Sequence, residues 1–292
     1  MDAIILSAGE GRRLRPMTLH LPKPLIPVSC EPFIEFTIRR LESAGVFRCA
    51  VNIWYKAEMI EQYLSKRRKD GMEILPIKEK ELYGTGGGIS NAASLISGEE
   101  PIVVHNCDIY ADINMKEPMI EHRASEALVT LLVKKGSSEV NTSNGYVVDI
   151  AGKFGNNGEK SYKFTGISIW EREALKYLPL PGNTGCEIES LAKMISCGEK
   201  VRYFDIGDSF WCDIGSCKGY MEIHKYLYDN TQITNKFYDK GIRIKGFFYA
   251  CEGAKIGEGS RIENVVVWAG GEIRAGEEIE NAIIGPFGVI RI

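Results

Sequence analysis

The amino-acid sequence has no large excess of charge of either sign and no long apolar run. It carries 36 Lys and Arg residues against 39 Asp and Glu residues, for a formal net charge of −3. This balance predicts no general affinity for nucleic acid or for a membrane surface. No apolar run reaches the ~18 residues that span a bilayer. No basic stretch leads into an apolar core at the N-terminus, so we expect no signal peptide.

Paired cysteines and spaced histidines are missing too. The eight cysteines are scattered and none forms a Cys-x-x-Cys pair, which argues against a zinc site or a redox pair. We therefore expect free thiols in a reducing cytoplasm. The four histidines form no spaced cluster, and no Ser/His/Asp-type arrangement is evident.

The N-terminal stretch carries the first indication of a function. Residues 3–6 are apolar and predict a buried, central parallel strand. Small residues follow at 7–11, where Gly9 and Gly11 leave backbone N–H groups open to a ligand. The cations of this stretch come next, at Arg12, Arg13, Arg15 and Lys23. A strand, a glycine turn and clustered positive charge predict a polyphosphate site, and a tight βα turn with a solvated basic face is the alternative.

Two common phosphate-binding loops do not fit this stretch. The third glycine of a Gly-x-Gly-x-x-Gly loop is replaced by Leu14, and no Gly-Lys-Ser/Thr follows as in a Walker A loop. The positive charge is confined to residues 12–23, which is where a small anionic substrate would need it.

Strand and helix patterns alternate along the rest of the chain. Apolar spacing predicts helices at 32–44, 57–67, 171–178, 186–195 and 218–228, and strands at 49–53, 73–77, 101–104, 127–133 and 201–204. After the strand at 127–133, residues 141–147 are expected to form a loop. This alternation predicts an α/β fold with a mostly parallel sheet. In such sheets ligands bind beyond the carboxyl ends of the strands, where the loop at 7–15 lies.

Two further features suit ligand chemistry. Three consecutive glycines within 82–92 favour a flat ligand lying against bare backbone, with a flexible helix-entry loop as the alternative. Asp108 follows the apolar strand at 101–104, and a carboxylate just past a buried strand end can hold a hard cation such as Mg²⁺. A helix N-cap or a turn residue is the other interpretation of Asp108.

The C-terminal tail has a different periodicity. Apolar residues recur every five or six positions, at Ile256, Ile262, Val267, Ile273, Ile279, Ile284 and Ile290. Residues 256–272 and 273–289 are two copies of a 17-residue unit, a pattern typical of a parallel β-helix. We therefore predict a catalytic domain at 1–242 and a β-helix of about two coils at 243–292. Two coils cannot bury a core alone, so this piece must pack on the main domain or on another subunit. Of these we expect a homodimer or higher homo-oligomer formed through the tail.

Four ordered motifs resemble those of the sugar-1-phosphate nucleotidylyltransferases, also called NDP-sugar pyrophosphorylases. They are Ala8-Gly9-Glu10-Gly11-Arg12-Arg13-Leu14-Arg15-Pro16-Met17-Thr18, Pro22-Lys23-Pro24, Thr85-Gly86-Gly87-Gly88-Ile89 and Trp211-Cys212-Asp213-Ile214-Gly215. The resemblance covers roughly residues 1–228. It implies a Rossmann-like, three-layer nucleotide-diphospho-sugar transferase fold, and the tail resembles the short left-handed β-helices appended to some members.

The resemblance also implies a reaction and a set of roles. A sugar 1-phosphate attacks the α-phosphorus of a nucleoside triphosphate, and pyrophosphate leaves. Arg13 would bind the β- and γ-phosphates, Lys23 the α-phosphate, and Asp108 with Asp213 a Mg²⁺ ion. Further nucleotide contacts are expected from Ala8, Gly9, Gly11, Arg12, Thr85, Gly86 and Gly87, and sugar contacts from Asn106, Gly145 and Glu189.

Some positions depart from the family pattern. Cys107 stands before Asp108 where relatives carry glycine, and the Glu-Lys-Pro of many relatives is reduced to Glu159-Lys160-Ser161. Glu187 and Glu189 lie in the first turns of a predicted helix, where a carboxylate suits the helix dipole and needs no other function.

The substrates implied by the resemblance are mannose 1-phosphate and GTP, because the short β-helix tail is frequent in relatives so named. The Thr-Gly-Gly-Gly-Ile motif looks most like that of the N-acetylmuramate-1-phosphate uridylyltransferases. Glucose 1-phosphate with UTP or dTTP, and heptose 1-phosphate with GTP, also stay open. Phosphocholine-type cytidylyl transfer and a non-catalytic, nucleotide-sugar-binding regulatory subunit are weaker alternatives.

Overall fold

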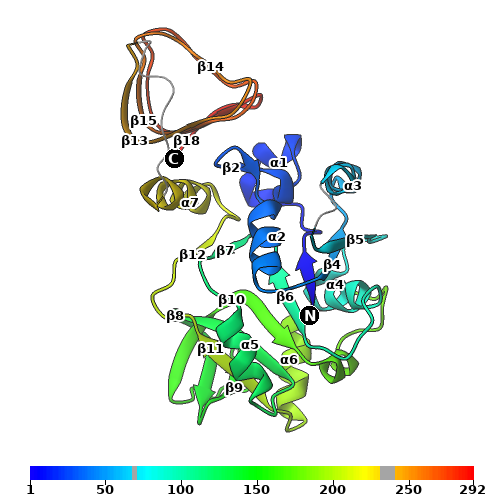
Figure 1. Ribbon diagram of the computed structural model, residues 1–292. Helices are drawn as coiled ribbons and strands as arrows, with labels where there is room; N and C mark the ends of the chain where they lie inside the picture. Colours follow the sequence, from blue (N-terminus) through cyan, green and yellow to red (C-terminus); the bar gives the residue numbers. More distant parts are fainter. Residues whose placement is uncertain (68–70, 231–240) are drawn as a thin grey trace. The chain divides into compact units, whose positions relative to one another are not determined.

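The computed structural model describes residues 1–67, 71–230 and 241–292 of the chain (Figure 1). The chain forms two compact units. Unit 1 comprises Met1–Gly9 and Phe36–Trp211, and unit 2 comprises Glu10–Glu35 and Cys212–Ile292. None of the helices among the described residues is long and apolar enough to cross a membrane.

The sheet of unit 1 has the strand order β11-β9-β8-β10-β6-β1-β4-β5. Its strands are β1 (Asp2–Leu6), β4 (Arg48–Ile53), β5 (Glu73–Lys78), β6 (Ile102–Asn106), β8 (Val129–Ser143), β9 (Tyr146–Ile150), β10 (Lys160–Trp170) and β11 (Val201–Asp205). Strands β5, β4, β1 and β6 are parallel, whereas β10 is antiparallel to both β6 and β8. The predicted α/β fold with a mostly parallel mixed sheet is therefore confirmed.

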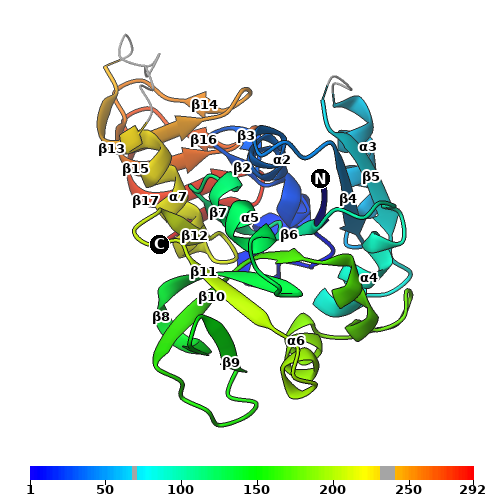
Figure 2. The same ribbon diagram turned by 60° about the horizontal axis from the view of Figure 1, so that its bottom comes forward.

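Helices lie on both faces of this sheet. They are α2 (Ile34–Ser43), α3 (Ala57–Lys66), α4 (Gly84–Ala93), α5 (Lys116–Arg123) and α6 (Glu187–Ser196), and a 3₁₀ helix covers Arg172–Tyr177. Right-handed crossovers put α2 and α3 on one face and α4 on the other. On the α4 face, side chains of β1, β4 and β6 pack with those of α4 and α6 in one buried cluster. The ribbons of α4 and α6 lie near each other in Figure 2.

Local sequence explains the buried face of α2 and where the helix ends. Ile34, Ile38 and Leu41 are fully buried and share one face at helical spacing. The last residue of the helix is Ser43, and the chain turns away at Gly45. The φ of Gly45, +85°, is the left-handed conformation that glycine adopts without a Cβ penalty. The Gly45 N–H donates to the Glu42 carbonyl at 2.9 Å, which satisfies one of the last carbonyls of the helix.

Three segments of unit 1 differ from the sequence-based expectation. Residues 141–147, read as a loop, form the end of β8, a two-residue turn and the start of β9. Asn144 and Gly145 occupy that turn with φ of +51° and +83°, the geometry that tight hairpins require. The helix expected at 171–178 is a 3₁₀ helix. The glycines within 82–92, for which a flexible helix-entry loop was the alternative interpretation, lie in the first turns of α4.

Unit 2 combines short N-terminal elements with the C-terminal part of the chain. The elements from its N-terminal segment are two 3₁₀ turns (Arg12–Leu14 and Lys23–Leu25), α1 (Met17–His20), β2 (Pro27–Val28) and β3 (Glu31–Pro32). Helix α7 (Cys217–Asn230) connects them to the tail: the Tyr220 hydroxyl donates to the Pro27 carbonyl at 2.5 Å and accepts from Trp268 Nε1 at 2.8 Å. These buried bonds join the first and last parts of unit 2.

The C-terminal strands, apart from the last one, are parallel and follow the predicted repeat. They are β13 (Arg243–Ala250), β14 (Lys255–Ile256), β15 (Arg261–Val267), β16 (Glu272–Ile273), β17 (Glu278–Gly285) and β18 (Gly288–Arg291). Ile256 pairs with Ile273 and Ile262 with Ile279, so neighbouring strands are offset by the 17 residues of the repeat. Figure 1 shows these strands as the sides of a triangular coil.

The end of the coil differs from the expected column of inward residues. Ile262, Val267, Ile273, Ile279 and Ile284 are buried in one cluster, and Ile256 packs against it partly buried. The expected seventh member, Ile290, lies in β18, which turns back antiparallel to β17 and pairs with residues 282–285. A hairpin therefore pairs half of the outer edge of β17.

Candidate functional site

In unit 1 the candidate site begins at the carboxyl ends of β1 and β6. The order of the parallel strands reverses between these two, because β4 and β5 lie on the other side of β1. Leu6 pairs with Asn106, and the Cys107 N–H donates to the Leu6 carbonyl at 2.9 Å. The loop that begins at Ser7 and the residues around Asp108 therefore start side by side, at the position where open α/β sheets bind ligands.

Asn106 and Asp108 are half-buried residues at this edge, and between them Cys107 is buried. A Cβ on Gly166 of β10 would lie 2.8 Å from Asn106 Nδ2, so the glycine leaves room for that amide. His105 precedes them with its ring buried, and burial lowers its pKa to about 4, which keeps the imidazole neutral. His105 therefore adds no positive charge at this edge near neutral pH.

The glycines of α4 pack against the chain itself. A Cβ on Gly87 would lie 2.2 Å from the Asn183 carbonyl oxygen, and one on Gly86 would lie 2.9 Å from the Cys186 carbonyl carbon. The Gly86 N–H also donates to the Gly185 carbonyl at 2.9 Å. This close approach of two backbones explains the glycine run without a ligand. The expected base contacts of Thr85, Gly86 and Gly87 stay a prediction.

Glu187 is a functional candidate that the sequence did not distinguish from its neighbour Glu189. Its side chain is buried, receives a hydrogen bond from Ser168 Oγ at 3.2 Å, and burial raises its pKa to about 7. The Glu187 N–H donates to Thr85 Oγ1 at 2.9 Å, which links α6 to the first turn of α4. Glu189, the predicted sugar contact, is exposed, as is Gly145 in the turn between β8 and β9. The helix predicted at residues 186–195 does not by itself show which of the two glutamates is buried, because the sequence does not show which face of that helix packs against the protein.

A second set of residues missed by sequence reasoning lies under the first loop. Asn52, at the end of β4, accepts a hydrogen bond from the Ser7 N–H at 2.7 Å through its Oδ1 atom. Its Nδ2 atom donates to Glu79 Oε1 at 2.7 Å. Glu79 is buried, which raises its pKa, and its Oε2 atom accepts from the Tyr83 N–H at 3.0 Å. A polar residue within the apolar strand 49–53 was the available sequence sign of this network.

In unit 2 three charged side chains converge on Gly215. A Cβ on Gly215 would lie 2.6 Å from Arg13 Nη2, 2.7 Å from Asp213 Oδ1 and 3.0 Å from Lys23 Nζ. Arg13 Nη2 lies 3.6 Å from Asp213 Oδ2, and the Gly215 N–H donates to Asp213 Oδ1 at 2.6 Å. A side chain at this position would displace at least one of these charged groups, so glycine lets them lie close together. Two cations and one carboxylate thus form a compact, partly exposed cluster.

The remaining predicted residues of the N-terminal loop differ in their surroundings. Arg12 binds the Glu10 carboxylate through Nε at 2.7 Å and Nη2 at 2.9 Å, so its charge is already paired. Gly11 has a φ of +63°, and a Cβ there would lie 2.7 Å from Thr18 Cγ2. Ala8 is buried and Gly9 is exposed. Arg13, whose ion pair with Asp213 is longer at 3.6 Å, is therefore less tightly paired than Arg12.

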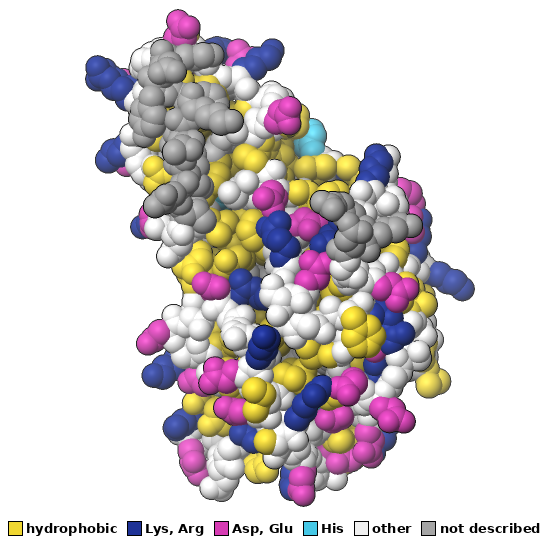
Figure 3. Space-filling model, viewed as in Figure 1, with side chains coloured by type: hydrophobic (Ala, Val, Ile, Leu, Met, Phe, Trp, Pro, Cys, Tyr) yellow, Lys and Arg dark blue, Asp and Glu magenta, His cyan; other side chains and the backbone are white. Residues whose placement is uncertain are grey.

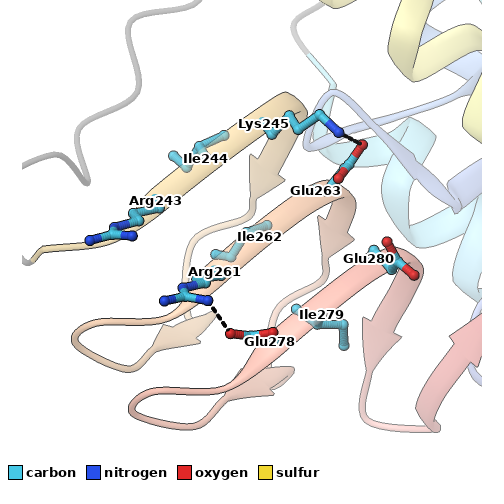
Figure 4. A pocket seen from close by; sticks show the side chains of 9 residues that line it. All are labelled: Arg243, Ile244, Lys245, Arg261, Ile262, Glu263, Glu278, Ile279 and Glu280. Atoms are coloured by element: carbon cyan, nitrogen blue, oxygen red, sulfur yellow. Dashed lines mark hydrogen bonds and ion pairs between the residues drawn. The ribbon is translucent and has the colours of Figure 1, made fainter.

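A separate hollow of about 660 Å³ lies over β13, β15 and β17, and Figure 4 shows its lining residues. Two ion pairs join neighbouring strands across it: Lys245 with Glu263 at 2.8 Å, and Arg261 with Glu278 at 2.5 Å. Exposed pairs of this kind contribute at most about 1 kcal/mol each. The predicted site residues all lie outside the lining of this hollow.

No group of three or more His, Cys, Asp or Glu side chains in the described part of the chain could by itself hold a metal ion. On the face drawn in Figure 3, described residues of both charge signs are mixed, without a broad patch of one sign. All eight cysteines are free thiols.

A family model described as nucleotidyl transferase matches residues 2–230 of the chain. The chain belongs to this family. Its homologues act as sugar-1-phosphate nucleotidyltransferases, so the predicted family and enzyme class are confirmed.

Relatives of this nucleotidyl transferase cover most of its length. It is 26% identical to a mannose-1-phosphate guanylyltransferase of Mycobacterium tuberculosis, over 94% of this chain and 82% of that protein. It is 30% identical to a D-glycero-alpha-D-manno-heptose 1-phosphate guanylyltransferase of Aneurinibacillus thermoaerophilus, over 78% of this chain and 98% of that protein. A solved structure of a putative glucose-1-phosphate thymidylyltransferase from Bacillus anthracis superposes with a TM-score of 0.68 at 18% identity, over 82% of this chain and 99% of that one. That last likeness concerns the fold alone.

Proposed function

We propose that this nucleotidyl transferase joins a nucleoside triphosphate to a sugar 1-phosphate and releases pyrophosphate, with GTP and mannose 1-phosphate as its substrates. The observation that carries the proposal is the convergence of Arg13, Lys23 and Asp213 around Gly215. Two fixed cations beside one carboxylate suit a substrate that carries several phosphate charges and binds together with a divalent cation.

In this proposal Arg13 binds the β- and γ-phosphates and the leaving pyrophosphate, and Lys23 binds the α-phosphate. Both reactants are anionic, so neutralising their charge and aligning the attack supply most of the rate acceleration. The sugar-phosphate oxygen is already ionised and needs no general base. We call residues 7–11 the phosphate loop and residues 83–87 the base turn, after the roles proposed for Ala8, Gly9, Gly11, Thr85, Gly86 and Gly87.

Mg²⁺ is the proposed cofactor, with Asp108 and Asp213 as its proposed protein ligands. Carboxylate oxygens suit this hard cation, which usually takes only one or two carboxylates together with substrate phosphates and water. The hydrogen bond from the Gly215 N–H holds Asp213 Oδ1 in place and leaves Oδ2 facing the Arg13 guanidinium. When bound, Mg²⁺ supplies neutralisation of charge on the phosphate oxygens.

The substrate assignment rests on the names of relatives and on the tail. Two relatives are named as guanylyltransferases, one for mannose 1-phosphate and one for a heptose 1-phosphate. Both names support GTP, and the longer coverage of the first favours mannose 1-phosphate. Sugar contacts are proposed for Asn106, Gly145 and Glu189. Uridylyl transfer to N-acetylmuramate 1-phosphate, and thymidylyl or uridylyl transfer to glucose 1-phosphate, are the other substrates to compare.

We further propose a catalytic domain at residues 1–242 and a left-handed parallel β-helix of about two coils at 243–292. Parallel pairing at a 17-residue offset supports the β-helix. The chain would form a homodimer or higher homo-oligomer through this tail, and its free thiols suit a cytoplasmic location.

A screen for released pyrophosphate tests the proposal. The full chain with Mg²⁺ is incubated with each of GTP, UTP, dTTP, CTP and ATP against mannose, glucose, N-acetylmuramate and heptose 1-phosphates and phosphocholine. The expected result is the highest kcat/KM with GTP and mannose 1-phosphate. Turnover only with another pair would replace the substrate assignment. Nucleotide-sugar binding without turnover under any pairing would identify a regulatory subunit and reject the enzymatic proposal.

A further inference from the structure

The phosphate loop and the base turn are joined by a buried chain of hydrogen bonds within unit 1. The chain runs from the Ser7 N–H to Asn52 Oδ1 at 2.7 Å, from Asn52 Nδ2 to Glu79 Oε1 at 2.7 Å, and from the Tyr83 N–H to Glu79 Oε2 at 3.0 Å. Ser7 is the first residue of the phosphate loop, and Tyr83 is the first of the base turn. Two side chains therefore bridge the starts of the two segments.

Further bonds fix the ends of this chain. The Ser7 hydroxyl donates to the Asn52 carbonyl at 2.5 Å, and the Glu79 N–H donates to the Ile53 carbonyl at 2.9 Å. Ser7, Asn52, Glu79 and Tyr83 are each at most 5% exposed. Because water does not reach these groups, losing one partner leaves the other unsatisfied in a medium of low dielectric constant.

The helix that follows the base turn is shaped to admit this chain. A Cβ on Gly88 of α4 would lie 2.6 Å from Asn52 Nδ2 and 3.3 Å from Glu79 Oε1. Gly88 therefore lets α4 close onto the Asn52 amide. Within this chain of bonds, the amide contacts the phosphate-loop side through its oxygen and the base-turn side through its nitrogen.

We propose that Asn52 is a positioning residue that holds the phosphate loop and the base turn in one fixed relation, so that both ends of a nucleoside triphosphate are bound by a preformed site. The inference rests on the proposed function, since it takes the two segments as the phosphate and base contacts. Asn52 itself touches no substrate. A site preorganised in this way binds nucleotide more tightly because less ordering is needed on binding.

The orientation of the Asn52 amide provides a sharp test. Asn52→Asp keeps the acceptor for the Ser7 N–H but places a second carboxylate oxygen against Glu79 Oε1. Glu79→Gln keeps one acceptor but cannot accept from both the Asn52 amide and the Tyr83 N–H. In the double variant Asn52→Asp/Glu79→Gln, the amide introduced at position 79 donates to the carboxylate introduced at position 52, and its oxygen accepts from the Tyr83 N–H. The double variant therefore restores all three bonds, and the donor and acceptor are exchanged only in the bond between positions 52 and 79.

Affinity for GTP is measured by calorimetry on the full chain, with steady-state kinetics for both substrates. We expect each single variant to raise the Kd and KM for GTP about tenfold or more, with the KM for sugar 1-phosphate unchanged. The double variant should return to within about threefold of the wild type. Asn141→Asp is the matched control, because Asn141 is also buried and bonds Asn156 and Ser161, away from the two segments. It should lower stability and leave the Kd for GTP unchanged.

Two outcomes would overturn the inference. One is a double variant that binds GTP no more tightly than Asn52→Asp, and the other is Asn52→Asp with the Kd of the wild type. If Asn52→Asp does not fold, the comparison is made with Asn52→Ser, which removes both bonds without adding charge, and wild-type affinity there rejects the inference equally. Failure of the wild type itself to bind or turn over any nucleotide would reject the proposed function instead.

Discussion

The buried Glu187 carboxyl predicts a specific dependence of stability on pH. Its side chain is 3% exposed and accepts a hydrogen bond from the Ser168 hydroxyl, which itself accepts from Trp170 Nε1 at 2.8 Å. A neutral hydroxyl donor compensates little of the cost of burying a charge. Burial therefore raises the Glu187 pKa from its ordinary 4.5 to about 7.

The sign of the effect follows from proton linkage. The folded protein holds the Glu187 proton more tightly than the unfolded chain, so this carboxyl contributes its full stability below the unfolded pKa of 4.5 and loses it as pH rises through about 7. At 1.36 kcal/mol for each unit of pKa, the loss is about 3 kcal/mol, most of it between pH 5 and pH 8. Glu187→Gln has no proton to lose and should escape this decline.

Urea unfolding of the wild type and of Glu187→Gln at pH 5 and pH 8 measures the difference directly. The buried histidines 105, 122 and 224 have pKa values lowered to about 4 and act in the opposite direction, but they are common to both proteins and cancel in the comparison. Glu189→Gln, on the exposed face of the same helix, is the control and should change stability by less than about 0.5 kcal/mol. A wild type that loses no more stability than Glu187→Gln on going to pH 8 would refute the reasoning.

Other predictions concern the proposed catalytic groups and the tail. Lys23→Ala should reduce transition-state stabilisation by about 2–4 kcal/mol, and a loss of less than tenfold in single-turnover rate would remove the α-phosphate role. Asp108→Asn and Asp213→Asn should each abolish Mg²⁺-dependent turnover in a folded protein, with effects far from additive; normal Mg²⁺ dependence in either variant would remove that residue from the metal site. Deleting residues 243–292 should lower the Tm, because the bond from Trp268 to Tyr220 is lost, and give a lower mass by light scattering; a monomeric full-length chain at high micromolar concentration would contradict the oligomer.

The sequence by itself determined the elements whose hydrophobic pattern is contained within the element. The apolar run at 3–6 became β1, and the spacing of Ile34, Ile38 and Leu41 became the buried face of α2. The repeat in the tail determined the strand offset, since Ile256 pairs with Ile273 as the 17-residue unit requires. These patterns are local, because each residue's face follows from the period of its own element.

Only the tertiary structure decided which polar residues became partners. Asn52 and Glu79 meet because β4 and β5 end side by side, and the glycines of α4 are explained by a backbone at 183–187 that is distant in sequence. Glu187 is buried and Glu189 exposed because α6 packs one face against its neighbours, although both glutamates suit the helix dipole equally. Ile290 joined a hairpin because pairing the free edge of β17 satisfies backbone groups that continuing the coil would leave open. Burial and pairing at such positions depend on which surfaces meet after folding, and no local period encodes that.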